Sequence, residues 1–236
     1  RDDGPESHFK KAGTPTMGGV VIIGSILIAL FLCGNFLSIP LITTFGVMIS
    51  YFVLGFFDDY FKVLKKNTDG ISARGKLVWQ FVTALIAAYC LVYSNVIDTK
   101  LYVPFVKGPL LDMGFLYPLF AGVVVVACSN AVNLTDGLDG LAIGPIITSA
   151  ASLGILAYVA GHREIASYLY IPYVENVGEL TVIAAAIIGA GVGFLWYNSY
   201  PAQIFMGDVG SLSLGGILGI IAVLTKNEIL FILIGG

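Results

Sequence analysis

Five aspartates lie in three polar segments that interrupt an otherwise apolar chain: Asp58, Asp59, Asp136, Asp139 and Asp208. Two carboxylates about 5 Å apart repel each other by about 3 kcal/mol at an effective dielectric near 20, so a cleft that collects several of them needs protons or a cation. Carboxylate ligands without nearby His or Cys favour Mg²⁺, whose shell is often completed by substrate phosphates. We therefore expect a Mg²⁺ site for phosphoryl transfer if the three segments meet.

Lysines accompany the first acidic segment. Lys62, Lys65 and Lys66 follow the Asp58–Asp59 pair within two helical turns, and lysines in such places bind phosphate. Each feature also has a simpler interpretation, because an aspartate pair is often a solvated helix boundary, lysines mark the cytoplasmic side of a membrane protein, and an aspartate can cap a helix. The coincidence of three acidic segments keeps a cation and phosphate site open beside these interpretations.

The composition identifies the environment in which these segments must be positioned. Hydrophobic residues make up 57% of the chain and charged residues 11%, where soluble domains have about 25% charged residues. With a mean hydropathy of +0.91, the chain is not a soluble globular protein, a disordered chain or a nucleic-acid binder. It is an integral membrane protein, and we expect Cys33, Cys90 and Cys128 to be small core hydrophobes without a disulfide or metal role.

The hydrophobic pattern predicts an all-α polytopic fold. A helix needs about 20 apolar residues to cross the bilayer, and the apolar runs lack the alternation of barrel strands. Seven complete spans are expected, followed by a truncated eighth at 228–236, and residues 1–236 are expected to form one transmembrane catalytic domain. The seven windows are 17–37, 40–57, 77–96, 114–132, 141–160, 180–197 and 211–225.

Seven spans place all three acidic segments on one side of the membrane. The side that holds the N-terminal segment and the loops at 58–76, 133–140 and 198–210 carries 8 Lys and Arg, and the other side carries 4. This excess predicts that the acidic side is cytoplasmic. On the other side, the residues around 101–115 have the alternating pattern of a hairpin.

The ends of the sequence suggest a longer protein. The chain opens with Arg1 and a polar stretch that has no signal-peptide pattern. The last apolar segment makes a helix only about 14 Å long, roughly half of the bilayer core. We expect the chain to be the middle of a longer polytopic protein.

Four strings carry a resemblance to a known family: DDGPESHFKKAGTPTMGG, FFDDYFKVLKKNTDGISARGK, NAVNLTDGLDGLA and FLWYNSYPAQIFMGDVGSLSLGG. They closely resemble the phospho-N-acetylmuramoyl-pentapeptide transferases of the polyprenyl-phosphate N-acetylhexosamine-1-phosphate transferase superfamily. The resemblance implies a Mg²⁺-dependent enzyme of the bacterial inner membrane, with about ten spans. Such an enzyme transfers phospho-MurNAc-pentapeptide from UDP-MurNAc-pentapeptide to undecaprenyl phosphate at the cytoplasmic face, giving lipid I and UMP for peptidoglycan. A homodimer is left open.

The same resemblance assigns residues. It makes Asp208 the principal Mg²⁺ ligand, places Asp58 and Asp59 at the reaction centre with Asp58 as candidate base, and gives Lys62 and Lys66 a phosphate-handling role. Phe205 is expected to stack on uracil. The residues implied for the nucleoside and sugar-phosphate pocket are Lys11, Thr16, Asn133, Asp136, Asp139, Asn198, Phe205 and Gly207. The family's His-rich cytoplasmic loop has no counterpart before Gly236, so we do not expect the fragment itself to be active.

Alternatives remain at two levels. The lipid phosphate can attack directly, which we favour because its second pKa is already near 6, or an aspartate can attack first and form a phosphoryl-enzyme intermediate. The nearest rival activity is transfer from UDP-GlcNAc to the same lipid. The rivals from other classes are a cation-coupled transporter, whose intramembrane acids would line a pathway, and a structural membrane protein with solvated loops.

Overall fold

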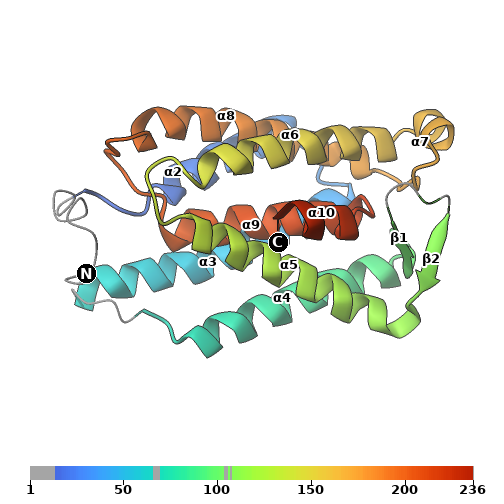
Figure 1. The fold of residues 1–236 in the computed structure, drawn as a ribbon, viewed down its shortest axis with the longest axis horizontal. Coiled ribbons are helices and arrows are strands. Elements are labelled where there is room, and N and C mark those ends of the chain that lie inside the picture. The colour runs from blue at the N-terminus through green and yellow to red at the C-terminus, as the bar shows by residue number, and fades with distance from the viewer. Residues whose placement is uncertain (1–13, 66–69, 104–105, 107, 236) are drawn as a thin grey trace.

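The computed structural model of the chain describes residues 14–65, 70–103, 106 and 108–235. Long helices lie side by side along the longest axis, with a short hairpin and a short helix at one end (Figure 1). The helices are α2 (Gly19–Cys33), α3 (Ile39–Lys65), α4 (Ala73–Tyr93), α5 (Tyr117–Thr135), α6 (Ile143–Ala160), α7 (Arg163–Leu169), α8 (Leu180–Asn198), α9 (Gly207–Leu224) and α10 (Glu228–Gly235).

Among the described residues, six helices are long and apolar enough to cross a membrane. The all-α polytopic class is therefore confirmed, and the expected number of complete spans is corrected from seven to six within this part of the chain. The window at 17–37 contains only the 15 residues of α2, which give a length of about 22 Å. This helix ends because Gly34 adopts an extended conformation with φ −83° and ψ 142°. The apolar stretch of the sequence continues beyond Gly34, where the backbone is no longer helical, so the predicted span was longer than the helix.

One acidic segment differs from the expected secondary structure, and another lies in the expected loop. Helix α3 continues to Lys65, eight residues past the predicted end at 57, so Asp58 and Asp59 stand on a helix and not in a loop. The Asp58–Lys62 pair, four residues apart, stabilises this extension. Asp136 follows the last residue of α5 as its C-cap, and Asp139 lies beyond it in a turn. These two aspartates therefore do not share a helix face.

Helix α9 forms the centre of the bundle, between α3 and α5 (Figure 1). Every residue from Val209 to Leu224 is buried. Glycines allow the close approach: a Cβ at Gly216 would lie 2.5 Å from the Tyr51 ring of α3, and one at Gly215 would lie 2.6 Å from Ser129 Cα of α5. Asp208 begins this central helix, so its position is fixed by the packing of the whole core.

The two ends of the bundle differ. The C-terminal end of α3 and the beginnings of α4 and α9 lie at one end, together with the turns after α5 and α8 (Figure 1). At the other end, β1 (Lys100–Tyr102) pairs antiparallel with β2 (Pro109–Asp112), which confirms the hairpin. The three cysteines are unpaired, but only Cys128 is buried. The prediction of core positions for Cys33 and Cys90 was wrong, because helix faces that meet lipid are as apolar as the core.

Candidate active site

Asp58, Asp59 and Asp208 form a compact acidic cluster. One carboxylate oxygen from each lies within 4.8 Å of the others. Asp58 and Asp59 come from the last turns of α3, and Asp208 comes from the first turn of α9. Asp58 and Asp59 are buried, whereas the Asp208 side chain is 16% exposed. The structure therefore brings together the aspartates that the sequence placed in two separate segments.

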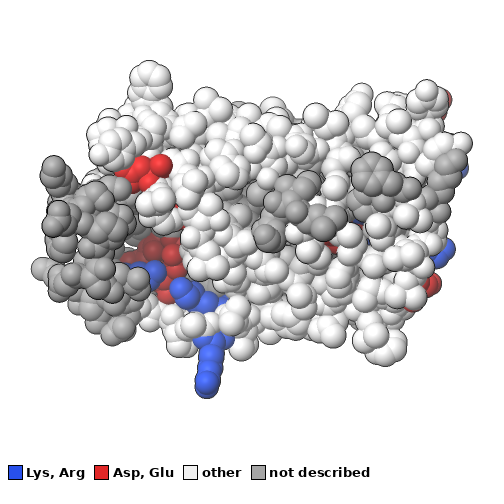
Figure 2. Space-filling view, in the orientation of Figure 1, with Lys and Arg blue, Asp and Glu red and all other residues white. Residues whose placement is uncertain are grey.

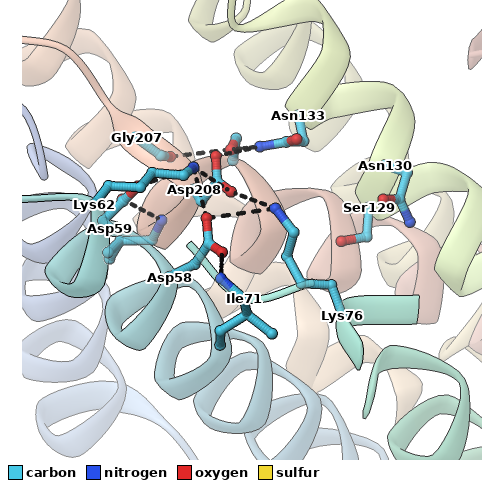
Figure 3. Close-up of polar contacts among 12 residues, drawn as sticks. Asp58, Asp59, Lys62, Ile71, Lys76, Ser129, Asn130, Asn133, Gly207 and Asp208 are labelled. Atoms are coloured by element: carbon cyan, nitrogen blue, oxygen red, sulfur yellow. Dashed lines mark hydrogen bonds and ion pairs between the residues drawn. The ribbon is translucent and has the colours of Figure 1, made fainter. Parts of the chain in front are cut away.

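Two lysines lie on this cluster. Lys62 Nζ is 2.6 Å from Asp58 Oδ2 and 3.2 Å from Asp208 Oδ2, and Lys76 Nζ is 3.4 Å and 3.0 Å from the same two oxygens. Both ammonium groups point at the carboxylates from different helices, α3 and α4 (Figure 3). The Ile71 N–H donates to Asp58 Oδ1 at 2.7 Å. Both Asp58 oxygens are therefore engaged.

Asn133 fixes the other side of Asp208. Its Nδ2 donates to Asp208 Oδ1 at 2.9 Å and to Ser211 Oγ at 2.8 Å. Asn133 lies in the last turn of α5, so three helices, α3, α4 and α5, each supply a side chain that contacts Asp208 or its neighbour (Figure 3). The Asp208 carboxylate is held in one orientation by two cations and an amide.

Asp59 caps helix α9 from a different helix. The Val209 N–H donates to Asp59 Oδ2 at 3.0 Å, which satisfies a backbone group that would otherwise lack a partner and places negative charge at the positive end of the helix dipole. Gly207 permits this approach, since it has a φ of +77° and a Cβ there would lie 2.4 Å from Asp59 Oδ2. Asp59 thus ties α3 to the start of α9.

A pocket opens beside the cluster. It is lined by Thr16, Asp59, Lys62, Val63, Asn133, Asp136, Phe205, Gly207 and Asp208. On the face shown in Figure 2, acidic and basic atoms gather around a hollow at the same end of the molecule. Acids and a lysine on one side of this pocket, with an aromatic ring among the lining residues, provide contacts for both charged and planar groups.

The segment before α2 holds Phe205 in place. The Phe205 N–H donates to the Pro15 carbonyl at 2.9 Å, and the Phe205 carbonyl accepts from the Gly18 N–H at 2.8 Å. The Gly19 N–H donates to the Met206 carbonyl at 2.8 Å. These backbone hydrogen bonds place Thr16 beside Phe205 at the rim of the pocket.

The pKa of Asp136 is shifted by its position in the pocket. Burial, together with the nearby Asp208 carboxylate, raises the pKa of Asp136 to about 7. Burial is the larger of the two causes, and both favour the protonated form of the carboxyl group.

The donor set fits a magnesium ion. All three cluster ligands are carboxylates, with no His or Cys among the candidate ligands of the described residues, and Mg²⁺ prefers hard oxygen ligands. Two lysines do not neutralise three carboxylates, so negative charge remains for a divalent cation. Asp208 is the cluster member that is both part of the pocket lining and partly exposed.

Two predicted pocket residues lie elsewhere. Asp139 Oδ2 accepts a hydrogen bond from the Ala202 N–H at 3.1 Å. Asn198 Oδ1 accepts from the Gly140 N–H at 3.0 Å, and its Nδ2 donates to the Ile204 carbonyl at 2.9 Å. Both side chains join the turn after α5 to the segment before α9 and do not line the described pocket. Lys11 and Lys66 lie outside the described residues.

Lys76 is a member of the site that the sequence pattern does not predict. In the sequence it marks only the cytoplasmic side, because it is separated from the Asp58–Asp59 pair by more than fifteen residues. The available signal was its position four residues after Ser72, whose Oγ accepts from the Gly75 N–H at 3.2 Å as an N-cap. A lysine in the first turn of a helix that starts beside the acidic segment is a candidate partner for those acids.

Comparisons with known proteins show which sequences this chain resembles. The model of the family described as "Glycosyl transferase family 4" matches residues 41–226, and "Phospho-N-acetylmuramoyl-pentapeptide-transferase signature 1" matches residues 11–23. Proteins named phospho-N-acetylmuramoyl-pentapeptide-transferase from Citrifermentans bemidjiense and Geobacter sp. strain M21 are each 52% identical over 236 residues, and one from Pelobacter propionicus is 51% identical. The alignments cover 100% of this chain and 66% of each relative.

Proposed function

Because the chain belongs to glycosyl transferase family 4, we propose that its protein transfers phospho-MurNAc-pentapeptide from UDP-MurNAc-pentapeptide to undecaprenyl phosphate. The products are lipid I and UMP, and the reaction belongs to peptidoglycan synthesis. The relatives that share 51–52% of its residues carry the name of this transferase. We further propose that the site faces the cytoplasm of a bacterial inner membrane and that residues 1–236 act as one catalytic domain.

The observation that supports this proposal best is the meeting of Asp58, Asp208, Lys62 and Lys76 at one side of the pocket. Transfer between two phosphates gathers negative charge in the transition state, so catalysis depends on positioning and charge neutralisation. Fixed ammonium groups supply neutralisation directly. The carboxylates supply the ligands for Mg²⁺, with Asp208 as principal ligand and Asp58 and Asp59 beside it.

The metal would contribute charge neutralisation between the substrate phosphates and the acidic cluster. The chain's own residues bind and orient the substrates. Lys62 is placed to leave its carboxylate partners for a substrate phosphate, since its side chain is 32% exposed. Phe205 and Thr16 hold the nucleoside side of the pocket, with Phe205 stacked on uracil, and Asn133 keeps Asp208 oriented.

The proposed reaction is a single displacement. An oxygen of the lipid phosphate attacks the phosphorus that carries the sugar, and the bond from that phosphorus to the bridging oxygen breaks, so UMP leaves with the electron pair. A dianionic lipid phosphate gives up no proton, and a monoanionic one gives its proton to Asp58. Asp58 is fully buried and Lys62 lies on its Oδ2, so this proton transfer requires Lys62 to turn toward the substrate.

The test is UMP release from UDP-MurNAc-pentapeptide by the full-length protein with Mg²⁺, with and without undecaprenyl phosphate. We expect release only when the lipid phosphate is present. Release without lipid would favour a phosphoryl-enzyme intermediate, and preference for UDP-GlcNAc in competition would assign the rival transferase activity. Ion flux into proteoliposomes without UMP release would contradict the proposal in favour of a transporter.

A further inference from the structure

A second polar layer lies within the bundle, one helical turn below the acidic cluster. It consists of Gln80 on α4, Ser129 and Asn130 on α5, and the hydroxyl of Tyr51 on α3. Gln80, Ser129 and Tyr51 are buried at 0% exposure. Uncharged polar side chains in a membrane-spanning bundle are costly unless hydrogen-bonded, and they join helices when they are. Such a layer needs an explanation.

The layer is continuous across four helices. Gln80 Nε2 donates to Ser129 Oγ at 3.3 Å, and Gln80 Oε1 accepts from Asn130 Nδ2 at 2.8 Å. Ser129 Oγ donates to the Leu212 carbonyl of α9 at 2.9 Å. The Tyr51 hydroxyl donates to the Gln80 carbonyl at 2.9 Å. Both ends of the Gln80 amide and the Ser129 hydroxyl therefore have partners on other helices.

Three residues of this hydrogen-bond network each lie one turn from a member of the active site. Gln80 follows Lys76 by four residues on α4, and Leu212 follows Asp208 by four residues on α9. Ser129 precedes Asn133 by four residues on α5 (Figure 3). Residues four apart on a helix lie on the same face. A hydrogen bond between two helices in the polar layer therefore limits how they shift or rotate against each other. It thereby fixes the relative positions of the active-site side chains one turn away.

We infer that Gln80, Ser129 and Asn130 are positioning residues that hold Lys76, Asn133 and Asp208 in register. The Lys76 to Asp208 distance of 3.0 Å and the Asn133 to Asp208 distance of 2.9 Å join the same three helices as the layer below. The directional hydrogen bonds between these helices add to the close packing of the core by fixing which turns of neighbouring helices lie level with one another. The inference rests on the proposed function only for the consequence that misplacement slows turnover.

The first measurement is steady-state kinetics of the full-length protein with Mg²⁺, UDP-MurNAc-pentapeptide and undecaprenyl phosphate. Gln80→Met keeps the length of the side chain and removes its hydrogen bonds, and Ser129→Ala is the milder variant if Gln80→Met fails to fold. Because a displacement of about 1 Å can cost roughly a hundredfold in rate, we expect kcat to fall by about ten- to a hundredfold. KM for the nucleotide substrate should change little, because no layer residue lines the described pocket.

The matched control is Ser213→Ala. Ser213 is also fully buried, but its Oγ donates to the Val209 carbonyl of its own helix at 2.6 Å. We expect this variant to keep the wild-type kcat. Equal losses of kcat in Ser129→Ala and Ser213→Ala, or wild-type kcat in both Gln80→Met and Ser129→Ala, would overturn the inference.

A second measurement does not depend on the reaction. Hydrogen–deuterium exchange of a peptide that covers residues 73–80 should increase in Gln80→Met, because this segment of α4 carries Lys76 and loses its link to α5. The same peptide should be unchanged in Ser213→Ala. If the wild-type protein released no UMP, the proposed function would fail, and this exchange result would still decide the inference: unchanged exchange in Gln80→Met would refute it.

Discussion

Asp208 differs from Asp58 and Asp59 in the exposure and the contacts of its carboxylate. Asp58 is enclosed by Lys62, Lys76 and the Ile71 amide, and Asp59 is bonded to the start of α9. Asp208 contacts the same lysines and also lines the pocket. Asp59 lines the pocket as well, but its side chain is 6% exposed against 16% for Asp208. Asp208 is therefore the more accessible of the two, which suits its proposed role as principal metal ligand.

Replacing Asp208 by Asn should lower the initial rate by more than about a hundredfold, because it removes a full charge where charge neutralisation dominates catalysis. The measurement is rate against Mg²⁺ concentration for the full-length protein. A simple helix cap predicts little change, because Asn is itself a good cap and caps contribute only about 1 kcal/mol of stability. Glu164→Gln, exposed on α7 at the other end, is the control and should behave as wild type.

Phe205 should contribute through its ring. Stacking on a base is worth about 1–3 kcal/mol, so Phe205→Ala should weaken binding of the UDP-sugar by about one to two decades, whereas Phe205→Trp should largely keep it. Isothermal titration with both variants measures this directly. Wild-type affinity in the alanine variant would mean that the ring serves only to pack the segment before α9.

Residue identities were more predictable than their contacts. The sequence placed Asp58, Asp59 and Asp208 on one membrane side, because spans of known length fix the side of every loop. It did not find Lys76, since that contact depends on where α4 begins relative to α3, and local spacing does not encode this. It also did not separate Asp139 and Asn198, which join two turns, from Asp136, which lines the pocket.

At the scale of helices, the crossing of α2 and α9 depends on two facing glycines. A Cβ at Gly19 would lie 2.2 Å from Gly210 N, so the two backbones are in contact. Next to this crossing, backbone hydrogen bonds hold the segment before α2 and the start of α2 against Phe205 and Met206. The position of the Phe205 ring therefore depends on a helix contact that has no side chains.

Gly19→Ala should destabilise the protein by about 1–3 kcal/mol, because overpacking forces the helices apart. Gly24→Ala, on the same helix, meets nothing within 4 Å and should be neutral or stabilising by up to about 1 kcal/mol, as expected for replacing Gly in a helix. Thermal unfolding of the full-length protein in detergent compares the two. Equal midpoints for both variants would show that the contact is loose.

Helix boundaries were the least predictable feature at this scale. Hydropathy overestimated α2 by including residues after Gly34, and it ended α3 at 57 because charged residues begin there. In α3 the charges continue the helix, since Asp58 and Lys62 pair on one face and point into the site. Hydropathy measures suitability for lipid, and it does not detect a helix that continues past its apolar run with charged residues.

At the scale of the whole molecule, the predicted direction of each successive helix agrees with the structure, even though α2 is too short to count as a complete span. Helix α2 still runs from the site end, where Gly19 meets Gly210, to the end where α3 begins. Every later helix therefore keeps its expected direction, and the three acidic segments meet. The hairpin and α7 lie at the opposite end (Figure 1).

This arrangement predicts which end is reachable from outside an intact cell. The segments predicted from the sequence to lie on the acidic side carry 8 Lys and Arg, against 4 on the other side, and such an excess marks the cytoplasmic side. Ser72 is exposed at the start of α4 beside the site, and Ser167 is exposed on α7 at the other end. In full-length protein, Ser167→Cys should react with an impermeant thiol reagent added to whole cells, and Ser72→Cys should react only after the cells are opened. Labelling of Ser72→Cys from outside would place the site on the external face and contradict the proposed cytoplasmic orientation.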